Sequence, residues 1–229
     1  MNEKEIVSQA TSYVAKLLRA RFGKGPESIG VFLSDKCIMF HLRNFMGPVE
    51  QFLLTQEEEK AFRHTRELLM ESLLPEMKIY LKEIAGLGIS EFYYDWGLHN
   101  ASGMIVGLIQ PIPGEPSADY EGKELLHAQI AQVTAEIQKT PEYMDSWWVA
   151  PRALAVFRQG ITLLLEKEMV ELGYSEVLKA AKRRLEKRKL EQEVEAGEIL
   201  DKTVTDVYVD WDFDRDRSIA VYIFKEDVR

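Results

Sequence analysis

The chain has 229 residues, and its hydrophobic fraction of 46% with a charged fraction of 29% is typical of a folded globular protein. Acidic residues outnumber basic ones by 38 to 29, and the resulting net charge of −9 argues against a general nucleic-acid binder, which needs a basic surface. The single cysteine, Cys37, excludes an intramolecular disulfide and any site built from several thiolates.

The apolar runs of the chain are short, and the longest include Ile161–Leu165. They fall far below the roughly 20 residues that cross a bilayer, so we expect no direct membrane insertion. The first ten residues contain acids and no apolar core of a signal peptide. Together with the lone thiol, these features predict a cytoplasmic protein.

The first half of the chain predicts a helix, a β-hairpin, a long helix and a second β-hairpin. Gly23 and Pro26 end the first helix, because glycine accepts the left-handed cap and proline cannot continue the helix. Pro75 is expected to kink the long helix or to begin a second segment there. The expected bounds are 3–22 (helix), 29–33 and 37–43 (strands), 56–84 (helix), and 89–98 and 104–109 (strands).

A proline-rich segment near the midpoint, from Gln110 to Ser117, interrupts both helix and central strand. We therefore predict two domains, 1–110 and 118–229, joined by a linker at 111–117. The second domain repeats the order of elements. Its expected bounds are 123–139 (helix), 147–149 and 153–157 (strands), 167–198 (helix), and 203–213 and 219–224 (strands). The buried face of its long helix is expected to carry Tyr174, Val177, Ala181 and Leu185.

The two halves match at a constant shift of 115 residues, which indicates a tandem duplication. The clearest match is between 89–96 and 204–211, where Tyr-x-Asp-Trp is retained. Alternation along a strand places each Trp in the core, against the long helix of its half. The predicted fold is therefore α+β: a duplicated helix–hairpin–long helix–hairpin unit with antiparallel sheets covered by helices.

Four acids alternate between Asp210 and Asp216, which imitates the start of a calcium loop. However, Arg215 stands where the loop needs glycine, and Val221 stands where it needs a bidentate acid. The same period of two is what a strand produces, with its acids on the outer face. We predict a strand followed by a charged turn, and no metal site.

The four histidines, at positions 41, 64, 99 and 127, lack the spacing of a metallohydrolase. Cys37 and His41 share one face of a strand, but four residues along a strand cover about 13 Å, which is too far for a nucleophilic pair. Phosphate-binding loops and dinucleotide fingerprints are also missing from the sequence. We predict no catalytic residues and no cofactor.

Two arginines and two aspartates are candidate ligand-binding residues. Arg43 and Arg158 each end the second strand of a half, where a guanidinium can bind a carboxylate or bicarbonate, or form an internal salt bridge. Asp95 and Asp210 belong to the retained Tyr-x-Asp-Trp and must be solvated or paired. The basic run 179–189 is either a contact for anionic partners or a solvated helix face with i,i+4 ion pairs.

Segment 21–58, RFGKGPESIGVFLSDKCIMFHLRNFMGPVEQFLLTQEE, followed by a Leu/Glu-rich helix and a closing hairpin, resembles the bacterial MpsC-type family. The matching motifs are Gly-x-Gly-Pro-Glu at 23–27 and the strand ending in Arg43 before Phe-x-x-Pro-Val-Glu at 45–50. The second half resembles another copy, through 148–152 and 209–217. That copy lacks the Gly-x-Gly turn and the Pro-Val-Glu segment.

The resemblance implies a link to a sodium-translocating, membrane-potential-generating system associated with inorganic carbon uptake. It favours a soluble, non-enzymatic accessory or regulatory protein of a membrane ion or bicarbonate system. Its expected partner is a membrane transport subunit, which would hold the protein at the inner membrane. The alternative is a small-anion or metabolite sensor, or an enzyme, with its site between the two repeats. A small-anion ligand and a homodimer are further expectations.

Overall fold

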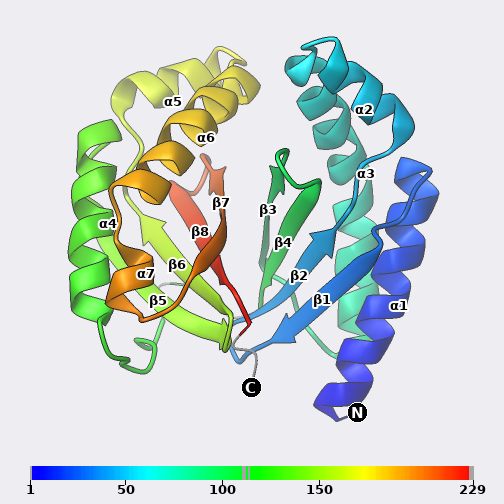
Figure 1. Cartoon of the computed structure of the whole chain (residues 1–229), viewed down its shortest axis with the longest axis horizontal. Helices are drawn as coiled ribbons and strands as arrows, with labels where there is room; N and C mark the ends of the chain where they lie inside the picture. Colours follow the sequence, from blue (N-terminus) through cyan, green and yellow to red (C-terminus); the bar gives the residue numbers. More distant parts are fainter. Residues whose placement is uncertain (1, 110–111, 113, 227–229) are drawn as a thin grey trace. The chain divides into compact units, whose positions relative to one another are not determined.

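The computed structural model describes residues 2–109, 112 and 114–226, and it divides into two compact units, Met1–Ile112 and Pro113–Arg229 (Figure 1). The predicted linker at 111–117 contains residues 111 and 113, which lie outside the described residues. Each unit consists of a four-stranded antiparallel sheet with helices against one face. The predicted α+β fold is therefore confirmed.

Unit 1 begins with a helix whose ends are set by local sequence. Asn2 accepts a hydrogen bond from the backbone of Glu5, whose side chain returns one, and Gly23 ends the helix with a φ of +72°. The elements are α1 (Glu3–Phe22), β1 (Ser28–Leu33), β2 (Cys37–Arg43), α2 (Pro48–Thr55), α3 (Glu59–Ala85), β3 (Glu91–Gly97) and β4 (Ser102–Leu108).

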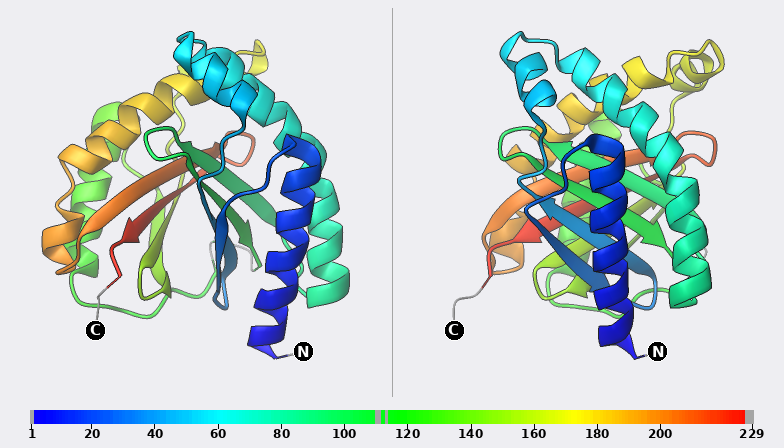
Figure 2. Two further views of the ribbon diagram at one scale, coloured as in Figure 1. Left: turned by 45° about the vertical axis from the view of Figure 1, so that its right-hand side comes forward. Right: turned by 90° about the vertical axis from the view of Figure 1, so that its right-hand side faces the viewer.

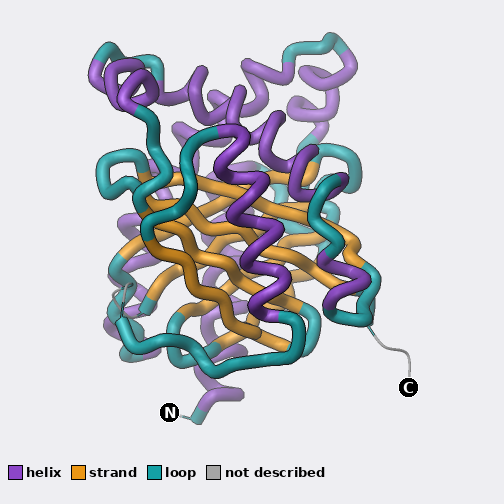
Figure 3. The backbone as a smooth tube through the Cα atoms, turned by 90° about the vertical axis from the view of Figure 1, so that its left-hand side faces the viewer, coloured by secondary structure: helices purple, strands orange, loops and turns teal. Residues whose placement is uncertain are grey.

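Unit 2 repeats this order with more interruptions among its helices. The elements are α4 (Lys123–Ile137), β5 (Tyr143–Ala150), β6 (Ala153–Gln159), α5 (Leu164–Glu171), α6 (Ser175–Gln192), α7 (Ala196–Ile199), β7 (Val204–Asp212) and β8 (Arg217–Phe224). Helices cover one face of its strands, as Figures 1 and 3 show.

The two sheets have the same topology. Their strand orders are β1-β2-β4-β3 and β5-β6-β8-β7, and every neighbouring pair is antiparallel. The first two strands form one hairpin and the last two form another, and the second strands of the two hairpins pair at the centre. This identity of strand order confirms that the chain contains two copies of one unit.

The strand register corrects one detail of the repeat. In unit 1, Gly103 pairs with Leu42 on one side and Trp96 on the other. In unit 2, Ser218 pairs with Arg158 and Trp211 in the same way. Arg158 is thus the counterpart of Leu42, and the equivalence of Arg158 with Arg43 that a constant shift implies is wrong by one residue.

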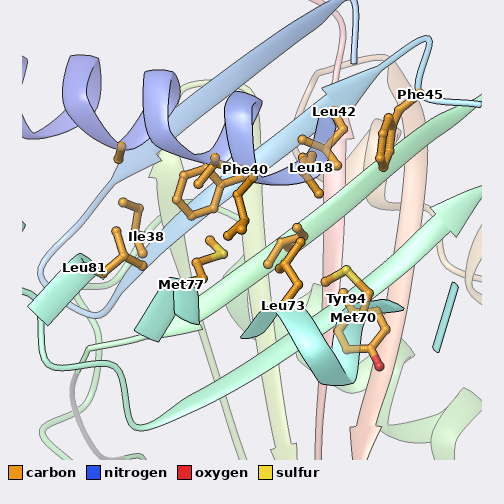
Figure 4. Close-up of a cluster of buried hydrophobic side chains, with 14 of the residues drawn as sticks. Leu18, Ile38, Phe40, Leu42, Phe45, Met70, Leu73, Met77, Leu81 and Tyr94 are labelled. Atoms are coloured by element: carbon orange, nitrogen blue, oxygen red, sulfur yellow. The ribbon is translucent and has the colours of Figure 1, made fainter. Parts of the chain in front are cut away.

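The core of unit 1 lies between its sheet and the helices α1 and α3. Strand alternation turns Ile38, Phe40 and Leu42 of β2 toward the helices, and Tyr94 and Trp96 of β3 point to the same side. Figure 4 shows this cluster, which includes Leu18, Ile38, Phe40, Leu42, Phe45, Met70, Leu73, Met77, Leu81 and Tyr94.

The core of unit 2 follows the same plan. Val207, Val209 and Trp211 of β7 pack with Leu126 of α4 and Leu190 of α6. Both tryptophans of the Tyr-x-Asp-Trp motif are only 3% exposed. The prediction that each Trp lies in the core against the helices of its own half is confirmed.

The helices differ from the prediction in two ways. In unit 1, the separate helix α2 precedes α3, and α3 continues through Pro75 without a second segment. In unit 2, the long helix expected at 167–198 is wrong, because three helices occupy this range. Gly173, with a φ of +82°, adopts the left-handed conformation between α5 and α6, which breaks the helix there.

The buried face of α6 is also different from the predicted one. Tyr174 and Val177 were expected on it from their apolar character, but they are 54% and 52% exposed. The buried positions instead include Lys182, Glu186 and Leu190. Charged residues occupy this face because each finds a partner of opposite charge inside the unit.

Candidate functional site: short helices held by buried ion pairs

The short helix α2 has a start that its sequence specifies. Pro48 lies in its first turn, where a missing N–H costs nothing, and Glu50 follows. The Oε2 atom of Glu50 accepts a hydrogen bond from the Gly47 amide at 2.7 Å. The carboxylate therefore satisfies a backbone donor that the helix itself leaves unpaired.

The same carboxylate forms a two-pronged ion pair with Arg66 of α3. The Nε atom of Arg66 donates to Oε1 of Glu50 at 2.7 Å, and Nη2 donates to Oε2 at 2.9 Å. Nη2 also donates to the carbonyl oxygen of Phe45 at 2.6 Å. The parallel geometry matches the planar guanidinium, which a lysine could not reproduce.

Aromatic rings surround the guanidinium of Arg66. Its Cζ atom lies 4.3 Å from the centre of the Trp96 ring and 4.8 Å from the centres of the Phe45 and Phe62 rings, with Phe22 at 5.4 Å. Burial lowers the pKa of Arg66, and the carboxylate of Glu50 opposes this effect. The rings and the carboxylate together stabilise a cation that is only 1% exposed.

Unit 2 contains a matching ion pair. The side chain of Glu166 in α5 accepts a hydrogen bond from the Leu163 amide at 2.9 Å and another from Nζ of Lys182 at 2.9 Å. The Lys182 ammonium lies 5.7 Å from the ring centre of Trp211 and 5.5 Å from that of Phe213. Burial lowers the pKa of Lys182, while Glu166 opposes this effect.

The two ion pairs occupy equivalent places in their units. Glu50 and Glu166 are 116 residues apart, as are Arg66 and Lys182. A search at a constant shift of 115 misses this match, although the shift of 115 holds for Trp96 and Trp211. In unit 2 the sequence Leu-Leu-Glu takes the place of Pro-Val-Glu, so the glutamate is retained without the motif around it.

Both short helices expose apolar side chains to solvent. On α2, Val49 is 72% exposed and Phe52 is 62% exposed, and on α5, Leu164 and Leu165 are 81% and 72% exposed. Each helix extends beyond the ends of the strands of its own unit (Figures 1 and 2). We call these the α2 face (Val49 and Phe52) and the α5 face (Leu164 and Leu165).

The candidate arginines have different surroundings. Arg43 is exposed at the end of β2. Arg158 is completely buried, where its Nη2 atom pairs with Oε1 of Glu186 and its Nη1 atom donates to Thr134 at 2.9 Å. Gln138 completes the cluster by donating to Glu186 at 2.8 Å. Of the two uses considered for Arg158, the structure therefore contains the internal salt bridge.

The candidate aspartates are both buried, at 1% for Asp95 and 3% for Asp210. Asp210 forms ion pairs with Lys179 at 3.4 Å and with Arg183 at 3.6 Å, both from α6. Asp210 and Arg158 therefore take different partners within unit 2, Lys179 and Arg183 for the former and Glu186 for the latter. A ligand role for these four residues stays a prediction.

Four of the seven basic residues in the run 179–189 form ion pairs within unit 2. Lys179 and Arg183 pair with Asp210, and Lys182 pairs with Glu166. Lys189 pairs with Glu136 at 2.6 Å and with Glu193 at 2.8 Å. These contacts favour the interpretation of a helix that carries ion pairs over that of a surface for anionic partners.

The acid-rich segment after β7 forms a turn. Asp212 pairs with Arg215 at 2.6 Å. Asp216 has a φ of +51° and accepts hydrogen bonds from the Ile161 and Thr162 amides, at 2.9 and 2.8 Å. Within the described residues, no group of three His, Cys, Asp or Glu side chains is placed to hold a metal ion.

A serine–histidine contact in unit 2 was not predicted from the sequence. The Ser146 hydroxyl lies 2.7 Å from Nε2 of His127 and 2.6 Å from the Tyr120 hydroxyl. Ser146 is completely buried, so a substrate has no access to its hydroxyl, and the contact ties β5 to α4. Burial lowers the pKa of His127, and the nearby Lys123 lowers it further.

Comparison with known proteins identifies the family. The family model described as "Na+-translocating membrane potential-generating system (MpsC)" matches residues 2–110. The first half of the chain therefore belongs to the MpsC family, and the second half repeats its fold. Searches of curated proteins and of solved structures found no match to the chain. No helix in the described part of the chain has the length and apolar character needed to cross a membrane.

We predict that Glu50→Gln destabilises unit 1 by about 3 kcal/mol, because removing one partner leaves the buried Arg66 cation uncompensated. Urea unfolding followed by circular dichroism measures this change. The matched control is Glu57→Gln at an exposed position, which should alter the free energy of unfolding by less than about 0.5 kcal/mol. Equal stability of the two variants would show that the ion pair does not hold the unit.

We also predict that unit 2 loses stability as the pH falls below about 6.5, the ordinary pKa of histidine. The unfolded chain takes up a proton on His127 at that pH, whereas the folded unit with its lowered pKa does not, so protonation favours unfolding. The melting temperature of the wild type should therefore fall faster with decreasing pH than that of His127→Gln. If the melting temperatures of the wild type and of His127→Gln fell equally with decreasing pH, His127 would not be the group responsible.

Proposed function

We propose that this member of the MpsC family is a non-enzymatic accessory protein of a membrane ion or bicarbonate transport system. It binds a membrane subunit from the cytoplasmic side through the α2 and α5 faces. The observation that carries the proposal is the exposure of large apolar side chains on two short helices, each of which a buried ion pair fixes in place.

The exposed residues support a contact with another molecule. Single apolar side chains are common on protein surfaces, but adjacent ones such as Leu164 and Leu165, both more than 70% exposed, are a liability in water unless a partner covers them. The buried pairs Glu50–Arg66 and Glu166–Lys182 would hold these helices ready for binding, which lowers the entropy cost of association.

The family description supports the choice of partner. It links residues 2–110 to a sodium-translocating system that generates membrane potential. Sodium translocation needs a subunit that spans the bilayer, and the described part of this chain has no helix able to do so. An accessory role beside such a subunit is consistent with both observations.

An anion sensor or enzyme is less well supported by the geometry. Arg158, the best-buried candidate for anion binding, already pairs with Glu186 and donates to Thr134. An incoming carboxylate or bicarbonate would have to displace a buried glutamate, which is costly.

The test uses cells that lack the gene and then receive variants of it. We expect Val49→Glu with Phe52→Glu to abolish restoration of the membrane potential, read with a voltage-sensitive dye, because charges replace the apolar contact. Ile79→Glu, at a 58% exposed position of α3, is the matched control and should restore the potential as the wild type does.

A second pair of variants tests unit 2 in the same cells. Leu164→Glu with Leu165→Glu should fail to restore the potential, while Leu125→Glu, at a 56% exposed position of α4, should succeed. Circular dichroism spectra and melting temperatures confirm that each variant folds. Full activity of both double variants would contradict the proposed docking faces.

A further inference from the structure

We infer that the docking surface of the partner is apolar and bordered by Lys and Arg side chains, as on the positively charged side of a membrane protein, and that it is not a lipid surface. This inference rests on the proposed function and adds the chemistry of the partner. It is carried by the acidic residues that border the two apolar faces and by the internal neutralisation of the basic residues nearby.

The α2 face is followed directly by acids. Glu57 and Glu58 lie in the exposed turn between α2 and α3, and Glu59 begins α3. Glu59 pairs with Arg63 at 2.7 Å. Because Arg63 neutralises Glu59, the negative charge after the α2 face comes from Glu57 and Glu58, against one exposed base, Lys60.

The α5 face has a similar border. Glu168 and Glu171 are exposed on α5 itself, and Glu176 is exposed in the first turn of α6. Lys167, the basic residue of α5, lies 3.4 Å from Asp216 and is thus drawn into an internal ion pair. Glu168 and Glu171 thus expose negative charge close to Leu164 and Leu165 along the chain.

The basic residues in the half of α6 that follows the α5 face in sequence do not change this balance. Lys179, Lys182 and Arg183 are directed to acids within unit 2. They are therefore not presented to a partner of the α5 face. A chain with a net charge of −9 and acids beside its apolar faces is repelled by anionic headgroups.

A membrane protein offers the complementary chemistry. Short cytoplasmic loops of membrane proteins carry an excess of Lys and Arg close to the ends of their spanning helices. An apolar face bordered by acids fits an apolar groove bordered by such bases, and the opposite charges speed encounter and select the partner. Anionic lipid headgroups and a second copy of this chain, with its net charge of −9, fit the acidic borders less well.

The experiment measures binding of the full-length protein to three kinds of vesicle. The first is inside-out membrane vesicles from the organism that makes the protein. The second is the same vesicles after protease treatment, and the third is liposomes of phosphatidylethanolamine with a minor share of phosphatidylglycerol. The variants are Glu57→Lys with Glu58→Lys, and Glu168→Lys with Glu171→Lys. The control is Glu71→Lys with Glu83→Lys, at exposed positions of α3.

We expect the wild type to bind intact vesicles in a salt-sensitive way and to bind the protease-treated vesicles and liposomes poorly. Each charge-reversed border variant should bind intact vesicles roughly tenfold more weakly, which corresponds to about 1.4 kcal/mol. It should also bind the liposomes better than the wild type does. The α3 control should bind intact vesicles as the wild type does, although it carries the same net charge as the border variants.

Other results would overturn the inference in distinguishable ways. Unchanged vesicle binding by the border variants, with loss of binding by Val49→Glu/Phe52→Glu, would leave the proposed function standing and reject the basic border. Equal binding to liposomes would identify lipid as the occupant. A dimer in sedimentation that Phe52→Glu dissociates would identify a second copy. Failure of the wild type to bind intact vesicles would reject the proposed function itself.

Discussion

A glutamate near the start of a short helix pairs with a buried cation of the next long helix, and the exposed apolar faces depend on this contact in both units. In unit 1 the contact joins Glu50 to Arg66, and the ring of Trp96 covers the guanidinium. Desolvation makes such a cation costly to bury, so its carboxylate and aromatic partners must stay in place together. The ion pair thus couples the position of α2 to the core of its unit.

The two units retain this contact but differ in their cores. At the sheet position where unit 1 has Leu42, paired with Gly103, unit 2 has Arg158, paired with Ser218. Four residues after the buried cation, α3 of unit 1 has Met70 and α6 of unit 2 has Glu186. The buried Arg158–Glu186 pair makes the core of unit 2 depend on exact partners, because either charge alone would be unpaired. The family match covers unit 1, whose core is apolar.

The sequence patterns predicted the strands, their hairpins and the duplication, because alternation and the repeat are strong signals for sheets. They did not predict the strand order within each sheet. They missed α2, since eight residues are too few to form an apolar stripe. They also placed Tyr174 and Val177 on the buried face of α6, where Lys182 and Glu186 lie instead. Pattern analysis assigns charged residues to solvent. It cannot detect the oppositely charged partners that allow such residues to be buried, because these partners lie on elements distant in sequence. The two ion pairs of the candidate site were missed for the same reason. They also match each other at a shift of 116 residues, whereas the search used a shift of 115.

Hydrogen–deuterium exchange of the full-length protein tests most directly whether the Glu50–Arg66 pair fixes α2. Loss of about 3 kcal/mol of local stability corresponds to roughly 100-fold faster exchange of the amides that it protects. We predict that in Glu50→Gln the amides of residues 51–56 exchange about 100-fold faster, a larger change than in α1. Exchange in 51–56 that equals the wild-type rate would contradict the claim that this buried ion pair holds the docking helix.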